Sequence, residues 1–408
     1  MIPTPPGKRF VPAAPGVGMD PDLSKLDAFL AEAGVDGYLI EADGDTADQR
    51  YLSGFTAPDP FVTLYTGETT LLVSALEYGR ATRVARANRV ERHSAYDHRA
   101  NVAEYGSPEG KYRTLAAFLE AHDADSVAVP SDFPVGTADG LREHGVSVRA
   151  DPDGVVGSIR ARKLDEEIEH VRATQRANEA AMARAEELLA SATVADGTLH
   201  LDGEALTAER VKRAIEIELL EHDCALDETI VACGADAADP HDRGSGPLAA
   251  GEAIIVDIFP RSKASGYYAD MTRTFCVGDP GETIERWYDL THEAQRAALD
   301  AIEAGVPGSD VHDAVCDVYE DAGLPTLRAD ETAETGFIHT TGHGVGLDIH
   351  EHPRLSEEET ELEAGNVVTV EPGLYDPEVG GVRIEDLVVV TEDGHENLTE
   401  YPIQFVSE

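Results

Sequence analysis

The chain is 408 residues long and 42% hydrophobic, which is enough for two domains that each bury a core of their own. It carries 79 acidic residues against 32 Lys and Arg, a formal net charge of −47. This balance excludes nucleic acid as an expected partner, because no basic stripe exists that could displace the counterions of a phosphate backbone. A membrane is not expected as a partner either, since no stretch approaches the ~18 uninterrupted apolar residues of a span.

The excess of carboxylates is spread along the whole chain rather than gathered in one tail. We interpret it as the acidic, solvated surface of a cytoplasmic protein from a halophilic, salt-adapted organism. At multimolar salt the Debye length falls below ~3 Å, which screens most of the self-repulsion. A cytoplasmic location also fits residues 1–18, which lack the apolar core of a signal peptide, and the four cysteines, which lie far apart without a C-x-x-C pair.

Residues 1–20 are rich in proline and glycine, and we expect them to form a flexible segment. Over residues 21–155, helical and strand patterns alternate, which predicts a three-layer α/β domain. Helices are expected at about 23–33, 76–88, 109–122 and 138–144, and strands at 37–40, 61–65, 69–74, 126–130 and 146–149. No cluster of polar side chains stands out in this domain, so its expected role is support, substrate access or subunit contact.

An Asp-Pro-Asp-Gly turn at residues 151–154 is the predicted linker to a second domain, residues 156–408. Helices are expected at 163–192, 204–222, 282–304 and 308–322, and strands and turns fill the rest of the domain from residue 226 onward. This pattern predicts an α+β domain with helices outside and a curved antiparallel sheet inside. All of the candidate chemistry falls in that sheet.

Two predicted strands of this domain each carry one aspartate in an otherwise apolar run. Asp257 lies in the strand 253–259 and Asp270 in the strand 266–275. A turn centred between Lys263 and Ala264 would place the two aspartates directly opposite each other, with Cβ atoms ~4.5–5.5 Å apart. Two bare carboxylates that close repel each other, and a divalent cation between them removes the repulsion.

A second acidic hairpin repeats this pattern. The predicted strands 367–371 and 382–390 bring Glu371 and Glu385 together, and the glycine-flanked His343 lies between the two hairpins in sequence. Each residue taken singly is more often ion-paired or hydrogen-bonded than a ligand, but burying all five unpaired would cost several kcal/mol apiece. Four carboxylates and one imidazole suit two divalent ions with shared carboxylates, and the oxygen-rich set favours manganese, cobalt or iron over a thiolate-type zinc site.

The second domain resembles the "pita-bread" metallopeptidases of family M24, and the two-domain layout resembles their prolidase (Xaa-Pro dipeptidase) and Xaa-Pro aminopeptidase branch. The matching motifs are Val256-Asp257, Ala269-Asp270-Met271-Thr272-Arg273-Thr274, Gly342-His343-Gly344-Val345-Gly346, Ile349-His350-Glu351-His352-Pro353, Val370-Glu371-Pro372-Gly373 and Gly381-Val382-Arg383-Ile384-Glu385-Asp386. The motifs cover residues 158–405. The first domain resembles the family's creatinase-like N-terminal domain in position and size only.

The resemblance implies a dinuclear centre that holds Mn²⁺ or Co²⁺, with Zn²⁺ or Fe²⁺ as alternatives. Asp257 would bind one ion, His343 and Glu371 the other, and Asp270 and Glu385 would bridge both. A hydroxide shared by the two ions would attack the peptide carbonyl, because coordination brings the pKa of water towards neutrality.

The resemblance also implies roles for residues around the ions. Glu371 would pass a proton towards the leaving nitrogen, and His350 would stabilise the oxyanion or orient the scissile amide. His241 matches the family's other active-site histidine, and His339 would lie near the pocket. Arg383 would bind the carboxylate end of the substrate or hold the active-site network.

Four further residues near these motifs affect the interpretation. Glu351 and His352, which follow His350, are not expected to be ligands. Phe259 stands where the family commonly has a small residue, and on the face of Asp257 its ring would narrow the pocket. Ala269 replaces a hydroxyl residue that the family often has before the second aspartate, which removes a potential hydrogen bond to the metal ligands.

The sequence therefore favours a homodimeric metallopeptidase that removes an N-terminal residue ahead of proline or splits Xaa-Pro dipeptides. Three alternatives share the fold: a creatine hydrolase, which does without the metal ligands, a lyase that acts on a sulfonium compound, and a non-catalytic peptide-binding module. The retained ligand residues speak against the first and third. The departure at Phe259 leaves room for the second.

The acidic composition predicts that concentrated KCl raises the midpoint of thermal unfolding, because screening removes repulsion between surface carboxylates. Thermal melts in dilute buffer and in multimolar KCl measure the effect. A neutral osmolyte at matched osmolality is the control, since it does not screen charge. A protein that is most stable in dilute buffer contradicts the interpretation.

Overall fold

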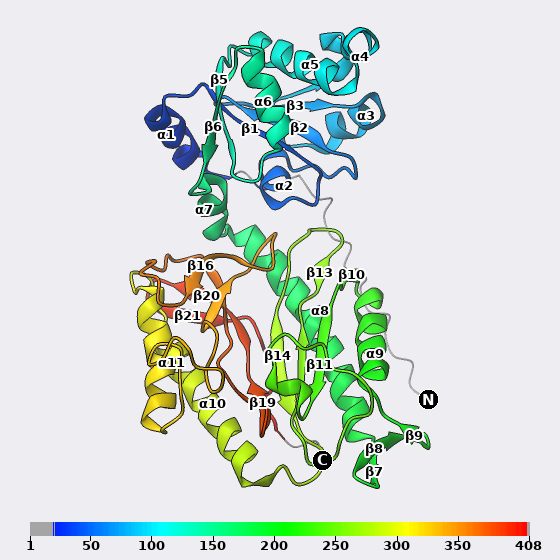
Figure 1. Cartoon of the computed structure of the whole chain (residues 1–408), viewed down its shortest axis with the longest axis vertical. Coiled ribbons are helices and arrows are strands. Elements are labelled where there is room, and N and C mark those ends of the chain that lie inside the picture. The colour runs from blue at the N-terminus through cyan, green and yellow to red at the C-terminus, as the bar shows by residue number, and fades with distance from the viewer. Residues whose placement is uncertain (1–18, 20, 406–408) are drawn as a thin grey trace, which may run out of the picture. The chain divides into compact units, whose positions relative to one another are not determined.

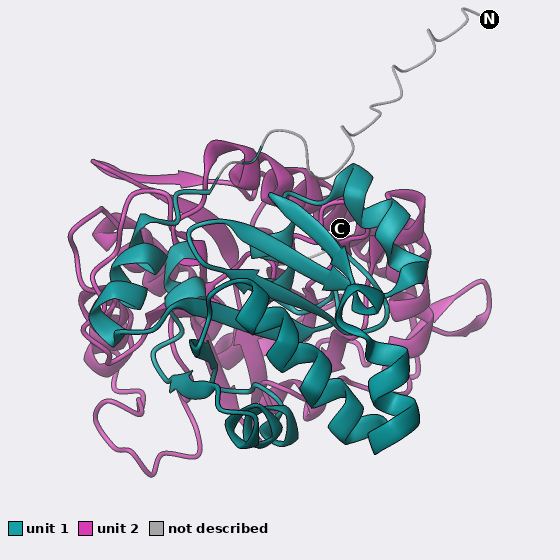
Figure 2. Ribbon diagram, turned by 90° about the horizontal axis from the view of Figure 1, so that it is seen from above, with its two compact units in different colours: residues 1–159 teal, residues 160–408 magenta. Residues whose placement is uncertain are grey.

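A computed structural model describes residue 19 and residues 21–405 of the chain, which divides into two compact units, residues 1–159 and 160–408 (Figures 1 and 2). The expected flexible segment, residues 1–20, lies outside the described residues except for residue 19. The boundary between the units falls within helix α7 (Val155–Ala161).

Unit 1 is built on a mixed six-stranded sheet with the strand order β4-β3-β2-β1-β5-β6. Its elements are α1 (Ser24–Ala33), β1 (Gly37–Ala42), α2 (Ala47–Ser53), β2 (Phe61–Tyr65), β3 (Thr69–Val73), α3 (Ala75–Val84), β4 (Arg89–Arg92), the 3₁₀ helix η1 (His93–Tyr96), α4 (His98–Tyr105), α5 (Ser107–Ala121), β5 (Ser126–Pro130), α6 (Val135–Glu143) and β6 (Ser147–Asp151). Strand β1 pairs antiparallel with β2 and parallel with β5.

Both faces of this sheet are covered, which confirms the expected three layers. On one face, Leu39 and Leu64 pack with Phe118 of α5 and Leu141 of α6. On the other, Leu71 and Val73 pack with Phe55 and with Ala81 of α3. The sequence patterns missed α2, β4 and α4. Helix α4 buries none of its side chains, so it carries no apolar periodicity that could have indicated it.

The second unit has four long helices and many short strands. Its elements are α8 (Asp165–Ala190), β7 (Thr193–Ala195), β8 (Thr198–Leu201), β9 (Glu204–Ala205), α9 (Ala208–Glu221), β10 (Cys224–Ala225), β11 (Thr229–Cys233), η2 (Asp236–Ala238), β12 (Ile254–Ile258), β13 (Arg261–Ser262), β14 (Met271–Phe275), α10 (Gly281–Ala301), α11 (Gly308–Asp321), β15 (Gly342–Gly344), β16 (Glu351–Leu355), β17 (Val367–Val370), β18 (Gly373–Asp376), β19 (Gly380–Arg383), β20 (Asp386–Thr391) and β21 (Gly394–Asn397). The helix expected from residue 204 begins at Ala208, because residues 204 and 205 pair with β8 instead.

Two antiparallel ladders of unit 2 carry the candidate site, namely β11-β12-β14 and β16-β15-β17-β20-β21. Helices α8 and α9 pack against the first through a core that includes Met182, Ile215 and Val256. Helices α10 and α11 pack against the second through a core that includes Val315 and Val368. The strands therefore lie between two pairs of helices (Figure 1).

The predicted register of the first acidic hairpin is wrong. Asp257 lies opposite Thr272, not Asp270. The same register continues through the bridge between Arg261 and Tyr268, so the turn centres one residue later than expected. Moving the centre of a hairpin by one residue moves every partner by two. Because side chains alternate with a period of two, Asp270 stays on the face of Asp257, two residue pairs further along the ladder than Thr272.

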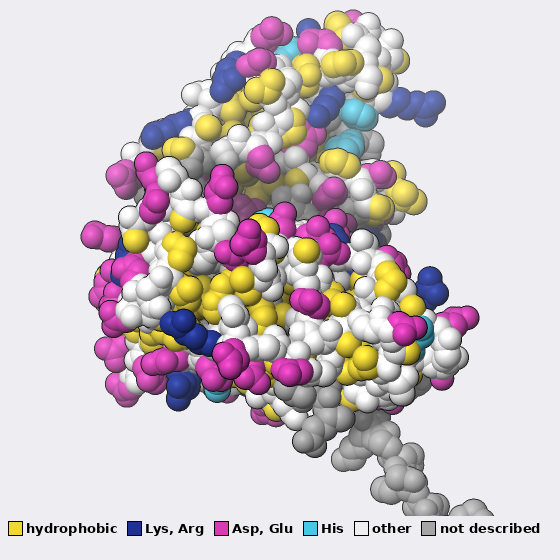
Figure 3. Space-filling model, turned by 60° about the horizontal axis from the view of Figure 1, so that its bottom comes forward, with side chains coloured by type: hydrophobic (Ala, Val, Ile, Leu, Met, Phe, Trp, Pro, Cys, Tyr) yellow, Lys and Arg dark blue, Asp and Glu magenta, His cyan; other side chains and the backbone are white. Residues whose placement is uncertain are grey.

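The surface is acidic, and the cysteines form no disulfides among the described residues, as expected from the sequence. Acidic side chains are scattered over the face drawn in Figure 3 rather than gathered in one patch. The four cysteines are free, and Cys224, Cys276 and Cys316 are buried. Among the described residues, no helix has both the length and the apolar character needed to cross a bilayer.

Candidate metal centre

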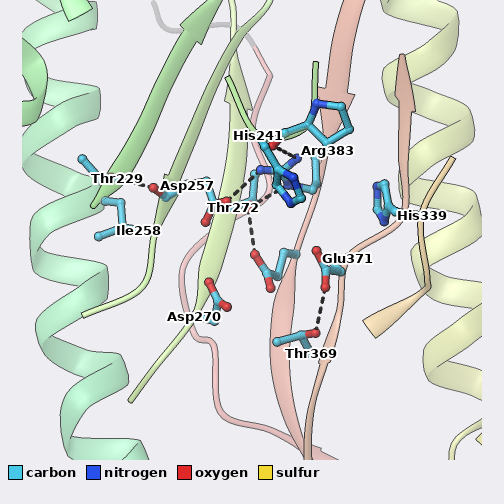
Figure 4. A network of polar contacts seen from close by, with 12 residues as sticks. Thr229, His241, Asp257, Ile258, Asp270, Thr272, His339, Thr369, Glu371 and Arg383 are labelled. Atoms are coloured by element: carbon cyan, nitrogen blue, oxygen red, sulfur yellow. Dashed lines mark hydrogen bonds and ion pairs between the residues drawn. The ribbon is translucent and has the colours of Figure 1, made fainter. Parts of the chain in front are cut away.

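Two hairpins bring the four predicted carboxylates to one place. Asp257 lies on β12, and Asp270 immediately precedes β14. In the other sheet Val370 of β17 pairs with Asp386 of β20, and one further step along this register places Glu371 opposite Glu385. Figure 4 shows the side chains of Asp257, Asp270 and Glu371 directed toward the same space between the two sets of strands.

His343 of β15 completes the cluster. Its Nε2 lies 3.3 Å from Glu371 Oε1 and 3.8 Å from Asp270 Oδ2. One ligand atom each from Asp270, His343 and Glu385 lie within 4.8 Å of one another, and all three side chains are buried. This is the spacing of atoms that share one cation.

Three carboxylate oxygens at this site have no hydrogen-bond partner among the described residues. They are Asp257 Oδ1, Asp270 Oδ1 and Glu385 Oε1. Buried polar atoms are normally paired, and an unpaired carboxylate oxygen is costly to bury. One such oxygen on each of three neighbouring side chains, beside an imidazole nitrogen, fits the donor set of a divalent cation. The predicted ligand residues are therefore compatible with bound metal.

Charge in the cluster points the same way. Burial raises the pKa of the Asp270 carboxyl well above its ordinary value, and the nearby carboxylates of Glu385, Asp257 and Glu371 raise it further. Burial, together with Glu371 and Asp257, likewise raises the pKa of Glu385. The pKa of Glu371 is raised to about 7, chiefly by burial. Without a cation these carboxylates cannot all remain ionised.

The imidazole is in the form that binds metal. Burial, and then the neighbouring His350, lowers the pKa of His343 to about 3, so its ring is neutral near pH 7. The flanking glycines are explained by close strand packing. A Cβ at Gly342 would lie 2.0 Å from the carbonyl oxygen of Thr369, and one at Gly344 would lie 2.2 Å from that of His352.

Two threonines hold the candidate ligands, and neither was predicted. The Thr272 hydroxyl donates to Glu385 Oε2 over 2.7 Å. The Thr369 hydroxyl accepts from the backbone N–H of His343 at 3.0 Å and donates to Glu371 Oε1 at 3.2 Å. Each threonine stands two residues before or after an acidic residue that adjoins its strand, and this spacing is the only sequence signal that could have indicated it.

Arg383 is committed to the network around Asp257. Its Nη2 lies 2.7 Å from Asp257 Oδ2, its Nη1 donates to the hydroxyl of Tyr375 at 2.9 Å, and its Nε donates to the Thr272 hydroxyl at 3.2 Å. It also donates to the carbonyl of Pro240, next to His241, at 3.4 Å. Of the two roles expected for Arg383, these contacts fit that of holding the network.

Arg273 supports the opposite side of the cluster from a fully buried position. Its guanidinium donates to the carbonyl oxygens of Glu385 at 2.6 Å and Thr272 at 3.0 Å, and forms an ion pair with Asp386 at 2.8 Å. It thereby ties the backbone of Glu385 to that of Thr272, whose hydroxyl contacts the Glu385 carboxylate. The sequence placed Arg273 in a motif without assigning it a role.

The remaining predicted histidines lie at different depths. The ring of His350 meets that of His343 edge to face at 4.4 Å, and His350 is exposed. His241 is also exposed, on the loop that follows η2. His339 stands apart from the carboxylates (Figure 4), where its Nε2 contacts the Tyr375 hydroxyl at 3.0 Å and burial lowers its pKa to about 3. The first two are available to a substrate, whereas His339 is engaged with the protein.

The two departures from the family pattern lie beside the cluster. Phe259 is half-buried, and its ring centroid lies 5.8 Å from the guanidinium carbon of Arg243. Ala269 is buried next to Asp270. Neither contributes an atom to the candidate ligand set.

One further residue at the site was missed by the sequence reasoning. Arg354 of β16 lies directly opposite His343 in the ladder and is half-buried. Its positive charge acts on His343, His350 and Glu371. Within the described part of the chain it forms no ion pair, although carboxylates are abundant. An arginine immediately after a recognised motif carries no periodic signal, and only the ladder register brings it to His343.

The raised pKa values predict that metal affinity falls as the pH drops through about 7, because Glu371, Asp270 and Glu385 must lose protons before they can bind a cation. Calorimetric titration of the metal-free protein with Mn²⁺, in two buffers of different ionisation enthalpy, measures both affinity and protons released. The Glu385→Gln variant should bind more weakly and release fewer protons. Affinity that is constant between about pH 5 and pH 8 would contradict the prediction.

Comparison with known proteins identifies the family of both domains. Residues 169–392 match metallopeptidase family M24, and residues 23–174 match the creatinase/prolidase N-terminal domain. An Xaa-Pro dipeptidase of Pyrococcus horikoshii is 28% identical over 94% of this chain and 97% of its own length. The structure of the prolidase from Pyrococcus horikoshii OT3 superposes with a TM-score of 0.76 at 26% identity, over 94% of this chain and 99% of that one. The structure of an Xaa-Pro dipeptidase from Bacillus anthracis superposes with a TM-score of 0.78 at 25% identity, over 94% of this chain and 98% of that one.

These matches confirm the expected fold class, an α/β N-terminal domain followed by an α+β pita-bread domain. They also confirm the resemblance on which the ligand assignment was based. The chain belongs to metallopeptidase family M24, with the domain layout of its prolidase branch.

Proposed function

We propose that the chain is a metal-dependent dipeptidase that hydrolyses Xaa-Pro dipeptides. The observation that carries this proposal is the set of three buried carboxylate oxygens, without a hydrogen-bond partner in the described part of the chain, beside the neutral imidazole of His343. Relatives that are named Xaa-Pro dipeptidases align over more than nine-tenths of the chain, which supports the choice of substrate. The alternative within the same family is an Xaa-Pro aminopeptidase, which acts on longer peptides.

We assign the ligands as the motifs imply. Asp257 would hold one ion, His343 and Glu371 would hold the other, and Asp270 and Glu385 would serve both. The oxygen-rich set favours Mn²⁺ or Co²⁺. Two divalent ions bound there would supply an activated water and polarise the scissile carbonyl.

The protein's own groups then handle protons and orientation. A pKa raised to about 7 suits the Glu371 carboxyl for moving a proton to the leaving nitrogen near neutral pH. His350 and His241 are exposed on the side of the cluster that a substrate can reach, so their rings can donate hydrogen bonds to the peptide. Arg383 keeps Asp257 in place through its ion pair.

Arg354 supports the preference for dipeptides. Its guanidinium is half-buried next to His343 and has no carboxylate partner within the described chain. In a dipeptide the free carboxylate is only one residue beyond the scissile bond. An arginine directly opposite His343, with no ion pair among the described residues, is suited to bind that carboxylate. In a longer peptide, a neutral amide occupies that place.

Other expectations belong to the same proposal. The enzyme would work as a homodimer in the cytoplasm of a salt-adapted cell, with domains at residues 21–155 and 156–408. The creatine hydrolase alternative finds no support in the site, because that reaction does without the metal ligands that are retained here. The sulfonium lyase stays the second candidate, through the departure at Phe259.

A panel of peptides tests the proposed function directly. Xaa-Pro dipeptides should be cleaved faster than the same dipeptides with alanine in place of proline, and faster than Xaa-Pro tripeptides. Chelation should abolish the activity, and added Mn²⁺ or Co²⁺ should restore it. Full activity in the metal-free protein, or cleavage of tripeptides alone, would overturn the assignment.

The role of Arg354 has its own test. Arg354→Ala should raise the KM for an Xaa-Pro dipeptide by roughly tenfold to a hundredfold, because one charge-assisted contact to the substrate is lost. The matched control is the same dipeptide with an amidated C-terminus, which should be a poor substrate for the wild type and be affected little by the variant. Equal effects on the free acid and the amide would rule out carboxylate binding.

A further inference from the structure

The loop that carries His350 is held from behind by the next residue along the chain. Glu351 is buried, and its Oε2 accepts from Lys163 Nζ at 2.9 Å while its Oε1 pairs with Arg160. Oε1 also accepts the backbone N–H of Asp348 at 3.0 Å. One carboxylate therefore joins two buried cations to the backbone of residues 346–350.

The loop is shaped to accept this carboxylate. A Cβ at Gly346 would lie 2.6 Å from Glu351 Oε1 and 2.7 Å from Oε2, so the carboxylate packs against the bare Cα of this glycine. The Gly346 N–H donates to the carbonyl of Asp348 at 3.0 Å, and its own carbonyl accepts the N–H of Tyr268 at 2.8 Å. The loop is thus also tied to the segment that precedes Asp270.

Consecutive side chains at this point face opposite ways. The Glu351 carboxylate contacts Arg160 and Lys163 in the interior, whereas the His350 ring is exposed and lies 4.4 Å from that of His343. The side chain of Asp348 adds a contact at the rim, where its Oδ2 lies 2.9 Å from Arg160 Nη2. Asp348 and Glu351, which flank residues 349 and 350, are therefore both bound to Arg160.

A buried ion cluster is not needed for stability alone, because replacing such clusters with well-packed apolar residues is often neutral or stabilising. An apolar side chain at position 351 could not accept the Asp348 N–H, nor define the path of the loop. The geometry points to a positional role for the charge.

We propose that Glu351 is a positioning residue that fixes loop 346–350, through Arg160 and Lys163, so that the His350 ring stays beside His343. The kinetic part of this inference rests on the proposed function. The structural part, that Glu351 holds the loop, does not.

Hydrogen exchange tests the structural part without any assay of activity. In Glu351→Gln, which weakens both ion pairs, amides of residues 346–350 should exchange at least about tenfold faster, while those of β17 and β20 stay as in the wild type. The control is Glu167→Gln. Glu167 is a buried glutamate on the adjacent helix α8 that accepts from Tyr267 and from the Leu164 N–H. Faster exchange throughout the protein, or the same pattern in the control, would overturn the proposal.

Asp348→Asn keeps the test valid if Glu351→Gln does not fold. It removes only the ion pair at the half-exposed rim and leaves the buried pairs intact. A smaller increase in exchange, confined to the same loop, is expected. No change in residues 346–350 would contradict the proposal.

A double-mutant cycle tests the action through His350. Glu351→Gln should lower kcat about tenfold in the wild-type background and less than about twofold in a His350→Ala background, with bound metal unchanged in both. Equal losses in the two backgrounds would mean a general structural effect. If the chain hydrolyses no Xaa-Pro peptide, the proposed function fails, and the exchange experiment alone still decides whether Glu351 holds the loop.

Discussion

The mutual repulsion of buried carboxylates is the constraint on which this site depends. Asp257, Asp270, Glu371 and Glu385 lie close enough that burial and their own charges raise the pKa values of three of them, and three of their oxygens have no partner in the described chain. Such a cluster is stable as a set of charges only around cations. The two hairpins, the neutral imidazole and the surrounding hydrogen bonds all follow from that requirement.

The protein meets this requirement with a rigid frame. Thr272 and Thr369 each hold a candidate ligand by a hydroxyl group, and Arg273 and Arg383 fix the backbone and the carboxylate of the two acidic hairpins. Hydrogen bonds that orient the ligands of a metal restrict the geometry in which it can bind. Because the contacts Thr272–Glu385 and Arg383–Asp257 join the two sheets, a displacement of one hairpin also displaces the candidate ligands of the other.

The scarce positive charges are used inside the second unit. The buried cations Arg160, Lys163, Arg273 and Arg383 each pair with a buried or half-buried carboxylate near the candidate site. On the acidic surface, salt can screen repulsion between carboxylates, but it cannot reach buried ones. The interior therefore needs fixed partners, either arginine and lysine or a bound cation. Arg354 forms no ion pair among the described residues, and the proposed dipeptidase function would use its guanidinium to bind a substrate carboxylate.

The sequence by itself determined the four long helices of unit 2, the two-domain layout and the motifs that carry the acidic residues and His343, because apolar periodicity and motif order are properties of the chain alone. The tertiary structure decided the strand register and the contacts between residues far apart in the sequence. The pairing of Asp257 with Thr272 depends on where the turn centres, and one residue of difference moves a partner by two. Arg354 and the partners of Glu351 reach the site only through strand register and through contacts with residues almost two hundred positions away. Local sequence does not encode such distances, so the candidate ligand residues could be named from the sequence, whereas the roles of Thr272, Thr369 and Arg354 could not.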